Sequence, residues 1–203
     1  MVMQNFGVLA KNGTGLWVFN VGFKCYRTLC FQRLHDFGDY KIIVSVGDTL
    51  PNATFQSMGD DGPVEHDIKD LTAGKKIVIF GLPGAYTNTC STAHMPSFVR
   101  NAETIRANGV DAIYCLAVND VHVMKSWAKD MGADVAQIGM LSDSDGSYTK
   151  EIGFDFTVPA VGFIGRSQRY SMIIENGVIT SLNEEIERTT CDISGGETIL
   201  DQL

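Results

Sequence analysis

Alternating apolar and polar segments predict a series of strands and helices from about residue 44 onward. Mainly apolar runs at 75–82 and 111–118 have the length of buried strands. Between them, apolar residues recur at helical spacing from Met95 to Ile105, and Gly109 follows as a stop signal. A strand, a helix and a second strand in this order predict a parallel pair of strands joined by a right-handed crossover.

The second half of the chain is predicted to add one helix, three short strands and a terminal helix. Their expected ranges are 121–131 (helix), 138–141, 169–175 and 178–182 (strands), and 197–203 (helix). Asp120 is a predicted helix N-cap, and Asn176-Gly177 is the dipeptide most typical of a two-residue hairpin. A loop at 59–63 between two short strands is expected before the first buried strand. The order predicts an α/β domain of the thioredoxin fold, with a central mixed sheet flanked by helices.

Composition and charge are those of a globular domain. Of the 203 residues, 44% are hydrophobic and 20% are charged, which is enough apolar material for a sizeable core. The formal net charge is −8, and no cluster of Lys and Arg could follow a phosphate backbone, so no nucleic-acid partner is expected. No apolar run reaches the roughly 18 residues of a membrane span, so no membrane partner is expected either.

Residues 1–42 differ in charge from the rest and are predicted to be an N-terminal extension ahead of a domain at 43–203. They hold five basic and two acidic side chains, so the remaining residues carry about −11. With the apolar stretch at 16–34, this asymmetry predicts a transit peptide, and the expected location is mitochondrial. Mitochondrial transit peptides are usually rich in serine, whereas this segment has no serine before Ser45. The alternatives are a cytoplasmic location, another organelle, or an N-terminal tail that carries no targeting signal.

Cysteine usage predicts working thiols rather than a disulfide scaffold or a metal centre. The five cysteines are few and scattered, and no Cys-x-x-Cys pair occurs. They are Cys25, Cys30, Cys90, Cys115 and Cys191. The expectation is an intracellular protein that uses one or two of these thiols and binds no metal.

Cys90 is the candidate nucleophile, because it is expected in the first turn of the helix that follows the strand at 75–82. Free backbone N–H groups and the positive end of the helix dipole favour a thiolate there. Thr87 stands where a thioredoxin-type Cys-x-x-Cys motif would have its first cysteine. With a hydroxyl in place of the first thiol, the motif cannot form an internal disulfide. A thiol with a hydroxyl beside it is suited to attack on an O–O bond.

The pattern Pro83-x-x-x-Thr87-x-x-Cys90 resembles the active-site motif of the peroxiredoxins. The fuller form, Pro-Gly-Ala-Tyr-Thr-x-x-Cys-Ser-x-x-His-x-Pro, is similar to their atypical, type II, peroxiredoxin 5-like branch. Asn88 departs from that pattern, since many members have proline there. The change affects the stiffness of the loop but none of the reacting groups.

Three further segments, 113–120, 124–127 and 166–170, also resemble that branch, so the similarity extends over roughly 44–203. The resemblance implies a thioredoxin fold with the N-terminal strand extension of peroxiredoxins.

The resemblance also implies a role for each matching residue. Cys90 would be the peroxidatic thiol, which attacks the peroxide and becomes a sulfenic acid. Thr87 would hold the sulfur and the peroxide through its hydroxyl, and Pro83 would shield the site from water. Arg169 would supply a fixed positive charge to the thiolate and the transition state.

Three neighbouring side chains allow other interpretations. Arg166 is the alternative to Arg169. His94 lies one helical turn after Cys90 and could form a Cys/His pair, but a hydrogen-bonded helix residue near the Pro96 kink is favoured. Tyr86 is expected to line the pocket or to contact a second subunit, in keeping with a homodimer.

Two cysteines are candidates for the resolving thiol. Cys191 lies in a polar, accessible segment before the last helix, where it resembles the resolving cysteine of animal-type members. Cys115 alternates with Ile113 and Ala117 in a predicted buried strand, which favours core packing, although plant-like members have their second cysteine there. Cys191 is the preferred candidate.

The function implied is a thiol-dependent peroxidase for hydrogen peroxide and organic hydroperoxides, acting in cell redox homeostasis. An external thiol reductant, glutathione with glutaredoxin or thioredoxin, would recycle the enzyme, and no cofactor is expected. The alternative is a peroxide sensor or redox-relay binding protein with little turnover.

Overall fold

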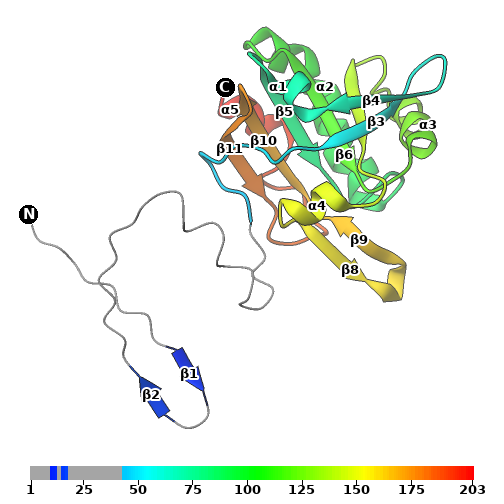
Figure 1. Cartoon of the computed structure of the whole chain (residues 1–203). Helices are drawn as coiled ribbons and strands as arrows, with labels where there is room; N and C mark the ends of the chain where they lie inside the picture. Colours follow the sequence, from blue (N-terminus) through cyan, green and yellow to red (C-terminus); the bar gives the residue numbers. More distant parts are fainter. Residues whose placement is uncertain (1–9, 13–14, 18–42) are drawn as a thin grey trace, which may run out of the picture. The chain divides into compact units, whose positions relative to one another are not determined.

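The computed structural model of the chain describes residues 10–12, 15–17 and 43–203 (Figure 1). The two short strands β1 (Ala10–Asn12) and β2 (Gly15–Trp17) pair antiparallel and belong to a unit separate from residues 43–203. The rest of the predicted extension at 1–42, with Cys25 and Cys30, lies outside the described residues.

The second unit contains a mixed sheet of seven strands in the order β11-β10-β5-β6-β7-β3-β4 (Figure 1). Strands β5, β6 and β7 run parallel to one another, and the other neighbouring pairs are antiparallel. The bounds are β3 Thr54–Met58, β4 Pro63–Asp67, β5 Lys76–Gly81, β6 Ala112–Ala117, β7 Ile138–Ser142, β10 Tyr170–Glu175 and β11 Val178–Glu184. This mixed sheet with flanking helices confirms the predicted α/β architecture.

Helices cover both faces of the sheet. Their bounds are α1 Ile68–Thr72, α2 Met95–Ala107, α3 Val121–Met131, α4 Ser147–Glu151 and α5 Gly196–Asp201. Apolar residues of α2, α3 and α5 pack in one core cluster, and those of α1 and α4 pack in another. Side chains of β5 alternate between the clusters, because successive residues of a strand point to opposite faces. Val78 and Phe80 belong to the first cluster, and Ile77 and Ile79 to the second.

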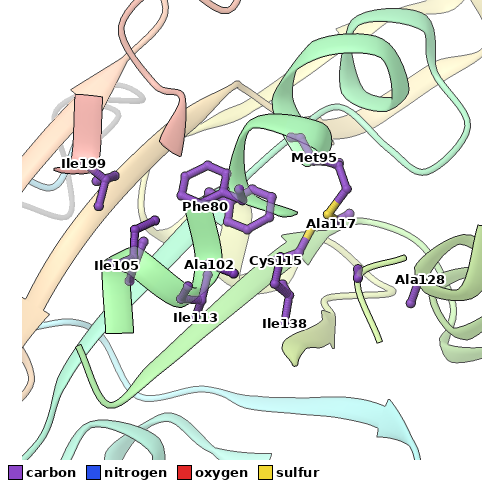
Figure 2. Close-up of a cluster of buried hydrophobic side chains, with 14 of the residues drawn as sticks. Phe80, Met95, Ala102, Ile105, Ile113, Cys115, Ala117, Ala128, Ile138 and Ile199 are labelled. Atoms are coloured by element: carbon purple, nitrogen blue, oxygen red, sulfur yellow. The ribbon is translucent and has the colours of Figure 1, made fainter. Parts of the chain in front are cut away.

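The first cluster positions the helix that begins near Cys90. Figure 2 shows Phe80, Met95, Ala102 and Ile105 from β5 and α2 grouped with Cys115 of β6. Phe80 also stacks on the ring of Phe98, with centroids 3.9 Å apart. Burial of aromatic and aliphatic side chains of this size contributes about 1.5–3 kcal/mol each. Helix α2 is thereby fixed against the centre of the sheet.

Local signals in the sequence account for several element ends. The Asp120 carboxylate accepts hydrogen bonds from the backbone N–H groups of His122 and Val123, so it caps α3 as predicted. Asn176 and Gly177 both have positive φ, at 50° and 81°, as a type I′ turn between β10 and β11 requires. The predicted loop at 59–63 joins β3 and β4, which form the N-terminal strand extension at one edge of the sheet.

Three features were not predicted. Short helices α1 and α4 lack an extended periodic pattern, and a small hairpin lies outside the main sheet. That hairpin pairs β8 (Asp155–Val158) with β9 (Phe163–Ser167), with a 3-10 turn, η2 (Pro159–Val161), between them. Its register shifts between Phe156 and Val158, which breaks the strict alternation that a sequence pattern needs. No helix in the described part of the chain is long and apolar enough to cross a membrane.

Candidate active site

Cys90 lies beyond the carboxyl ends of the parallel strands β5 and β6. Open α/β sheets usually bind their ligands at this edge. The chain leaves β5 at Gly81, turns at 83–86 and enters helical structure at Asn88, so Cys90 is in the first helical turn. Residues Cys90–His94 (η1) form a π-helical turn in which the Met95 N–H donates to the Cys90 carbonyl. Pro96 has no N–H to continue an α-helical ladder, which accounts for the irregular turn at this point.

Arg169 faces the Cys90 sulfur. It precedes β10, whose Tyr170 pairs with Gly81 at the end of β5. Its Nη1 atom lies 3.5 Å from Cys90 Sγ, and both side chains are almost fully buried. A buried guanidinium is costly unless it has partners. The Nη2 group donates to the Arg188 carbonyl at 3.3 Å, and Nε makes no hydrogen bond to the described residues.

His94 also contacts this arginine. Arg169 Nη1 lies 3.2 Å from His94 Nδ1, and His94 Nε2 lies 3.0 Å from the Ser194 carbonyl. The ring is fully buried and packs in edge contacts against Phe80 and Phe98. Burial, and next the positive charge of Arg169, lower the pKa of His94 to about 3. His94 is therefore neutral at physiological pH.

The loop before Cys90 carries the other two predicted site residues. Thr87 is half-buried, and its hydroxyl donates to the Gly84 carbonyl at 2.8 Å, which leaves oxygen lone pairs free as acceptors. Pro83, at the start of the loop, is buried. Gly84 has a φ of 155°, and an added Cβ would lie 2.6 Å from Arg166 Nη1, so a larger residue would displace the Arg166 guanidinium.

Arg166 binds this loop and forms no hydrogen bond with the Cys90 sulfur. Its Nη1 group donates to the carbonyls of Pro83, at 3.4 Å, and Val118, at 3.0 Å. Asn119, at the end of β6, accepts from the same Nη1 and from the Ala85 N–H. Of the two candidate arginines, the structure therefore brings Arg169, and not Arg166, to Cys90.

Tyr86 lies on the surface next to α3. It adopts a positive φ of 61°, is 54% exposed, and donates through its hydroxyl to Asp130 at 2.7 Å. It therefore forms no part of the buried cluster around the sulfur.

The three cysteines in the described residues are free thiols in different environments. Cys115 is fully buried in β6, and burial, with a further contribution from Cys90, raises the pKa of its thiol. Cys191 is half-buried, less accessible than the polar sequence around it suggested, and burial raises the pKa of its thiol too. A thiol with a raised pKa is a poor nucleophile until its environment changes.

A buried carboxylate organises the segment that carries Cys191. Glu185 Oε1 accepts hydrogen bonds from the Ile193 N–H, the Ser194 N–H and the Ser194 hydroxyl, each at 2.8 Å. Burial alone would raise the pKa of Glu185, but these donors lower it below its ordinary value. The segment 185–194 also contacts the active-site helix, because the Thr89 hydroxyl donates to the Thr189 carbonyl at 2.8 Å.

Sequence reasoning missed the links that His94, Glu185 and Asn119 provide. Asn119 could have been found, since it follows a parallel strand at the sheet edge where Cys90 lies. His94 was predicted as a hydrogen-bonded helix residue, but its partners Arg169 and Ser194 lie 75 and 100 residues away in the sequence. Glu185 binds the backbone of Ile193 and Ser194, and no local pattern marks it.

A thiol at the start of a helix, beside a buried arginine and at the carboxyl edge of a thioredoxin-like sheet, defines a thiol-dependent oxidoreductase. Comparison with known proteins agrees. The family model described as Redoxin matches residues 45–200. Peroxiredoxin-2C of Oryza sativa subsp. japonica is 41% identical over 161 residues, which cover 79% of this chain and 98% of that protein.

Two further matches extend the comparison. The chloroplastic Peroxiredoxin-2E of Arabidopsis thaliana is 42% identical over 148 residues, covering 70% of this chain and 62% of that relative. Relatives named as mitochondrial also occur. The structure of reduced Prx3 from Vibrio vulnificus in complex with hydrogen peroxide has 45% identity and a TM-score of 0.74, covering 79% of this chain and 99% of that one.

The chain belongs to the peroxiredoxin family, which confirms the resemblance seen in the motif around Cys90. It is a thiol-dependent peroxidase, an oxidoreductase whose substrate is a peroxide and whose electrons come from a thiol reductant.

Proposed function

We propose that the chain reduces hydrogen peroxide and organic hydroperoxides through a sulfenic acid on Cys90. The Cys90 thiolate attacks the terminal peroxide oxygen, an S–O bond forms, and the O–O bond breaks. The leaving oxygen takes up a proton and departs as water or an alcohol. The observation that carries the proposal is the 3.5 Å approach of the buried Arg169 guanidinium to the sulfur.

Arg169 would act electrostatically on both ends of this reaction. Its positive charge favours the thiolate over the thiol and stabilises the negative charge that develops on the leaving oxygen. Its Nε group has no hydrogen-bond partner among the described residues, so a donor is left for a peroxide oxygen. The low polarity around both groups strengthens the attraction.

Thr87 and Pro83 would orient and protect the substrate. Since the Thr87 hydroxyl already donates to Gly84, its lone pairs are the groups available to accept the peroxide proton. Pro83 lies at the end of β5 and has no N–H to attract water, so it would help to exclude solvent that competes with the peroxide.

We propose Cys191, rather than Cys115, as the resolving thiol. Its thiolate would attack the Cys90 sulfenic sulfur, so that a disulfide forms and water leaves. In the structure Cys191 is held in a half-buried segment that raises its pKa, so the segment must open first. Cys115 is fixed within β6 and has no comparable freedom. Glutathione with glutaredoxin, or thioredoxin, would then reduce the disulfide, and no bound cofactor is needed.

We also propose that residues 1–42 direct the protein to an organelle, with the mitochondrion as the first expectation. The positive charge of this segment against a negative domain supports the idea. Relatives named as chloroplastic or mitochondrial support it only in general terms.

A Cys191→Ser variant tests the resolving step and the alternative of a peroxide sensor. We expect fast oxidation of Cys90 but no intramolecular disulfide and no thioredoxin-dependent turnover, whereas Cys115→Ser should turn over like the wild type. Wild-type protein that is oxidised once but does not consume peroxide with any thiol reductant would favour the sensor instead. A Cys90–Cys115 disulfide, or only a glutathione adduct on Cys90, would show that the resolving role was misassigned.

A further inference from the structure

The Arg169 guanidinium has an unusual set of partners for a buried cation. Its Nη1 group lies between the Cys90 sulfur, at 3.5 Å, and His94 Nδ1, at 3.2 Å. The Nη2 group donates to the Arg188 carbonyl, and Arg169 forms no ion pair with a carboxylate among the described residues. The direction in which Nη1 points is therefore set by the sulfur and the imidazole together.

The hydrogen-bond chemistry allows only one protonation state of His94. A guanidinium donates and never accepts, so Nδ1 must be the acceptor of the contact with Arg169. A carbonyl accepts and never donates, so Nε2 must carry the hydrogen that contacts Ser194. Both contacts are satisfied at once by the neutral ring with its proton on Nε2. The Ser194 carbonyl thus selects the tautomer that presents a lone pair to Arg169.

The Ser194 carbonyl is itself held in place. Glu185 accepts from the N–H and the hydroxyl of Ser194 at 2.8 Å each, and Gly196 N–H donates to Ser97 of α2 on the far side. The His94 ring is packed edge-on against Phe80 and Phe98, which limits its rotation. The acceptor atom that faces Arg169 is accordingly rigid.

We infer that His94 is a positioning residue of the peroxidase reaction, in which its neutral ring holds the Arg169 guanidinium against the Cys90 sulfur. This inference rests on the proposed role of Arg169. It gives His94 no part in proton transfer, because both ring nitrogens are already engaged. His94 also remains a hydrogen-bond partner of the buried Arg169 guanidinium when oxidation removes the negative charge from the Cys90 sulfur.

Three substitutions of His94 test separately the hydrogen bonds made by its two ring nitrogens. Asn places an amide oxygen near the position of Nδ1, so His94→Asn keeps an acceptor for Arg169. Gln places an amide nitrogen near the position of Nε2, so His94→Gln keeps the donor to Ser194 and loses that acceptor. His94→Phe fills the space and keeps neither.

The test is the second-order rate constant for oxidation of Cys90 by hydrogen peroxide, measured in single turnover by stopped-flow tryptophan fluorescence. Trp127 is a suitable reporter, because its Nε1 donates to Ser91, the residue after Cys90. Loss of a hydrogen bond to a charged group predicts oxidation about 10-fold slower or more in His94→Phe and His94→Gln. His94→Asn should stay within about 3-fold of wild type. If His94→Phe does not fold, the contrast between Gln and Asn carries the test.

A double-mutant comparison separates this inference from the proposed function. In an Arg169→Met background, His94→Phe should slow oxidation by no more than about 3-fold further, since the group it positions is gone. Equal rates for the Asn and Gln variants, or a full loss in the Arg169→Met background, would overturn the role of His94. Wild-type oxidation of Arg169→Met alone would overturn the role of Arg169 instead.

Discussion

The Thr89 hydroxyl donates a hydrogen bond to the Thr189 carbonyl at 2.8 Å, across 100 residues of sequence. Thr89 precedes Cys90, and Thr189 lies two residues before Cys191. Together with the His94–Ser194 contact, this hydrogen bond joins the helix that carries the proposed peroxidatic thiol to the segment that carries the proposed resolving thiol.

Removal of this contact should speed the resolving step. Cys191 is half-buried and its thiol pKa is raised in the docked segment 185–194, so we expect this segment to loosen before Cys191 attacks. An exposed hydrogen bond contributes about 1 kcal/mol, so Thr89→Ala should raise the rate of disulfide formation by up to about 5-fold. The first oxidation of Cys90 should change little.

The rate of the second phase after one equivalent of peroxide measures this effect. Thr92→Ala is the matched control, because the Thr92 hydroxyl donates within the same helix to Asn88 and not to the Cys191 segment. Slower disulfide formation in Thr89→Ala would mean that the docked segment is the reactive one.

Arg169→Met should slow oxidation of Cys90 by about two orders of magnitude or more, since it removes the cation that contacts the sulfur among the described residues. The matched control is Arg100→Met, which breaks only the surface ion pair with Glu197. Stopped-flow oxidation with hydrogen peroxide gives both rates. If Arg169→Met reacts like the wild type while Arg166→Met is slow, the charge that matters is that of Arg166.

The buried neutral ring of His94 predicts a loss of stability in acid. Its folded-state pKa of about 3 lies below the ordinary value of 6.5, so the unfolded state binds more protons between these two values. The contribution is complete above pH 6.5 and falls as the pH drops toward 3. Between pH 7 and pH 5 the loss is about 2 kcal/mol for this one group.

Urea unfolding of the wild type and of His94→Asn at pH 7 and pH 5 tests this point. The free energy of unfolding should fall by about 2 kcal/mol more in the wild type than in the variant, because other titrating groups are common to both. An identical pH dependence in the two proteins would contradict a buried neutral ring at position 94.

Deletion of residues 1–42 should leave peroxidase activity and the melting temperature almost unchanged, and should move the protein to the cytosol in cells. Deletion of residues 1–50 is the informative comparison. It also removes the buried Val44 and Leu50 and the backbone bond from Leu50 to Gly177. Each buried side chain contributes about 1.5–3 kcal/mol, so the melting temperature should drop clearly. A large loss of stability on the shorter deletion would mean that the extension belongs to the fold.

Local patterns made much of the fold predictable. The apolar run of β5, the helical spacing of α2, the Asp120 cap and the Asn176-Gly177 turn each depend on residues close together in the sequence. Cys90 could be found in the same way, because its motif and its place at a helix start are local. The β8–β9 hairpin could not be predicted, because its register shift interrupts the alternation of apolar and polar residues.

The rest of the site depends on contacts across the chain. Arg169 is 79 residues from Cys90, and His94 meets the Ser194 carbonyl across 100 residues. Only the packing of β10 beside β5, and of the segment 185–194 over the helix, brings these groups together. The sequence alone could indicate Arg169 by resemblance, but it contained no sign that Glu185 and Ser194 would fix the ring of His94.

The central claim is that Cys90 takes up the peroxide oxygen. The most direct measurement is mass spectrometry of the Cys191→Ser variant after one equivalent of hydrogen peroxide and a dimedone-type reagent, which labels sulfenic acids. We expect a single adduct, on Cys90. An adduct on Cys115, Cys25 or Cys30 with Cys90 unmodified would contradict it.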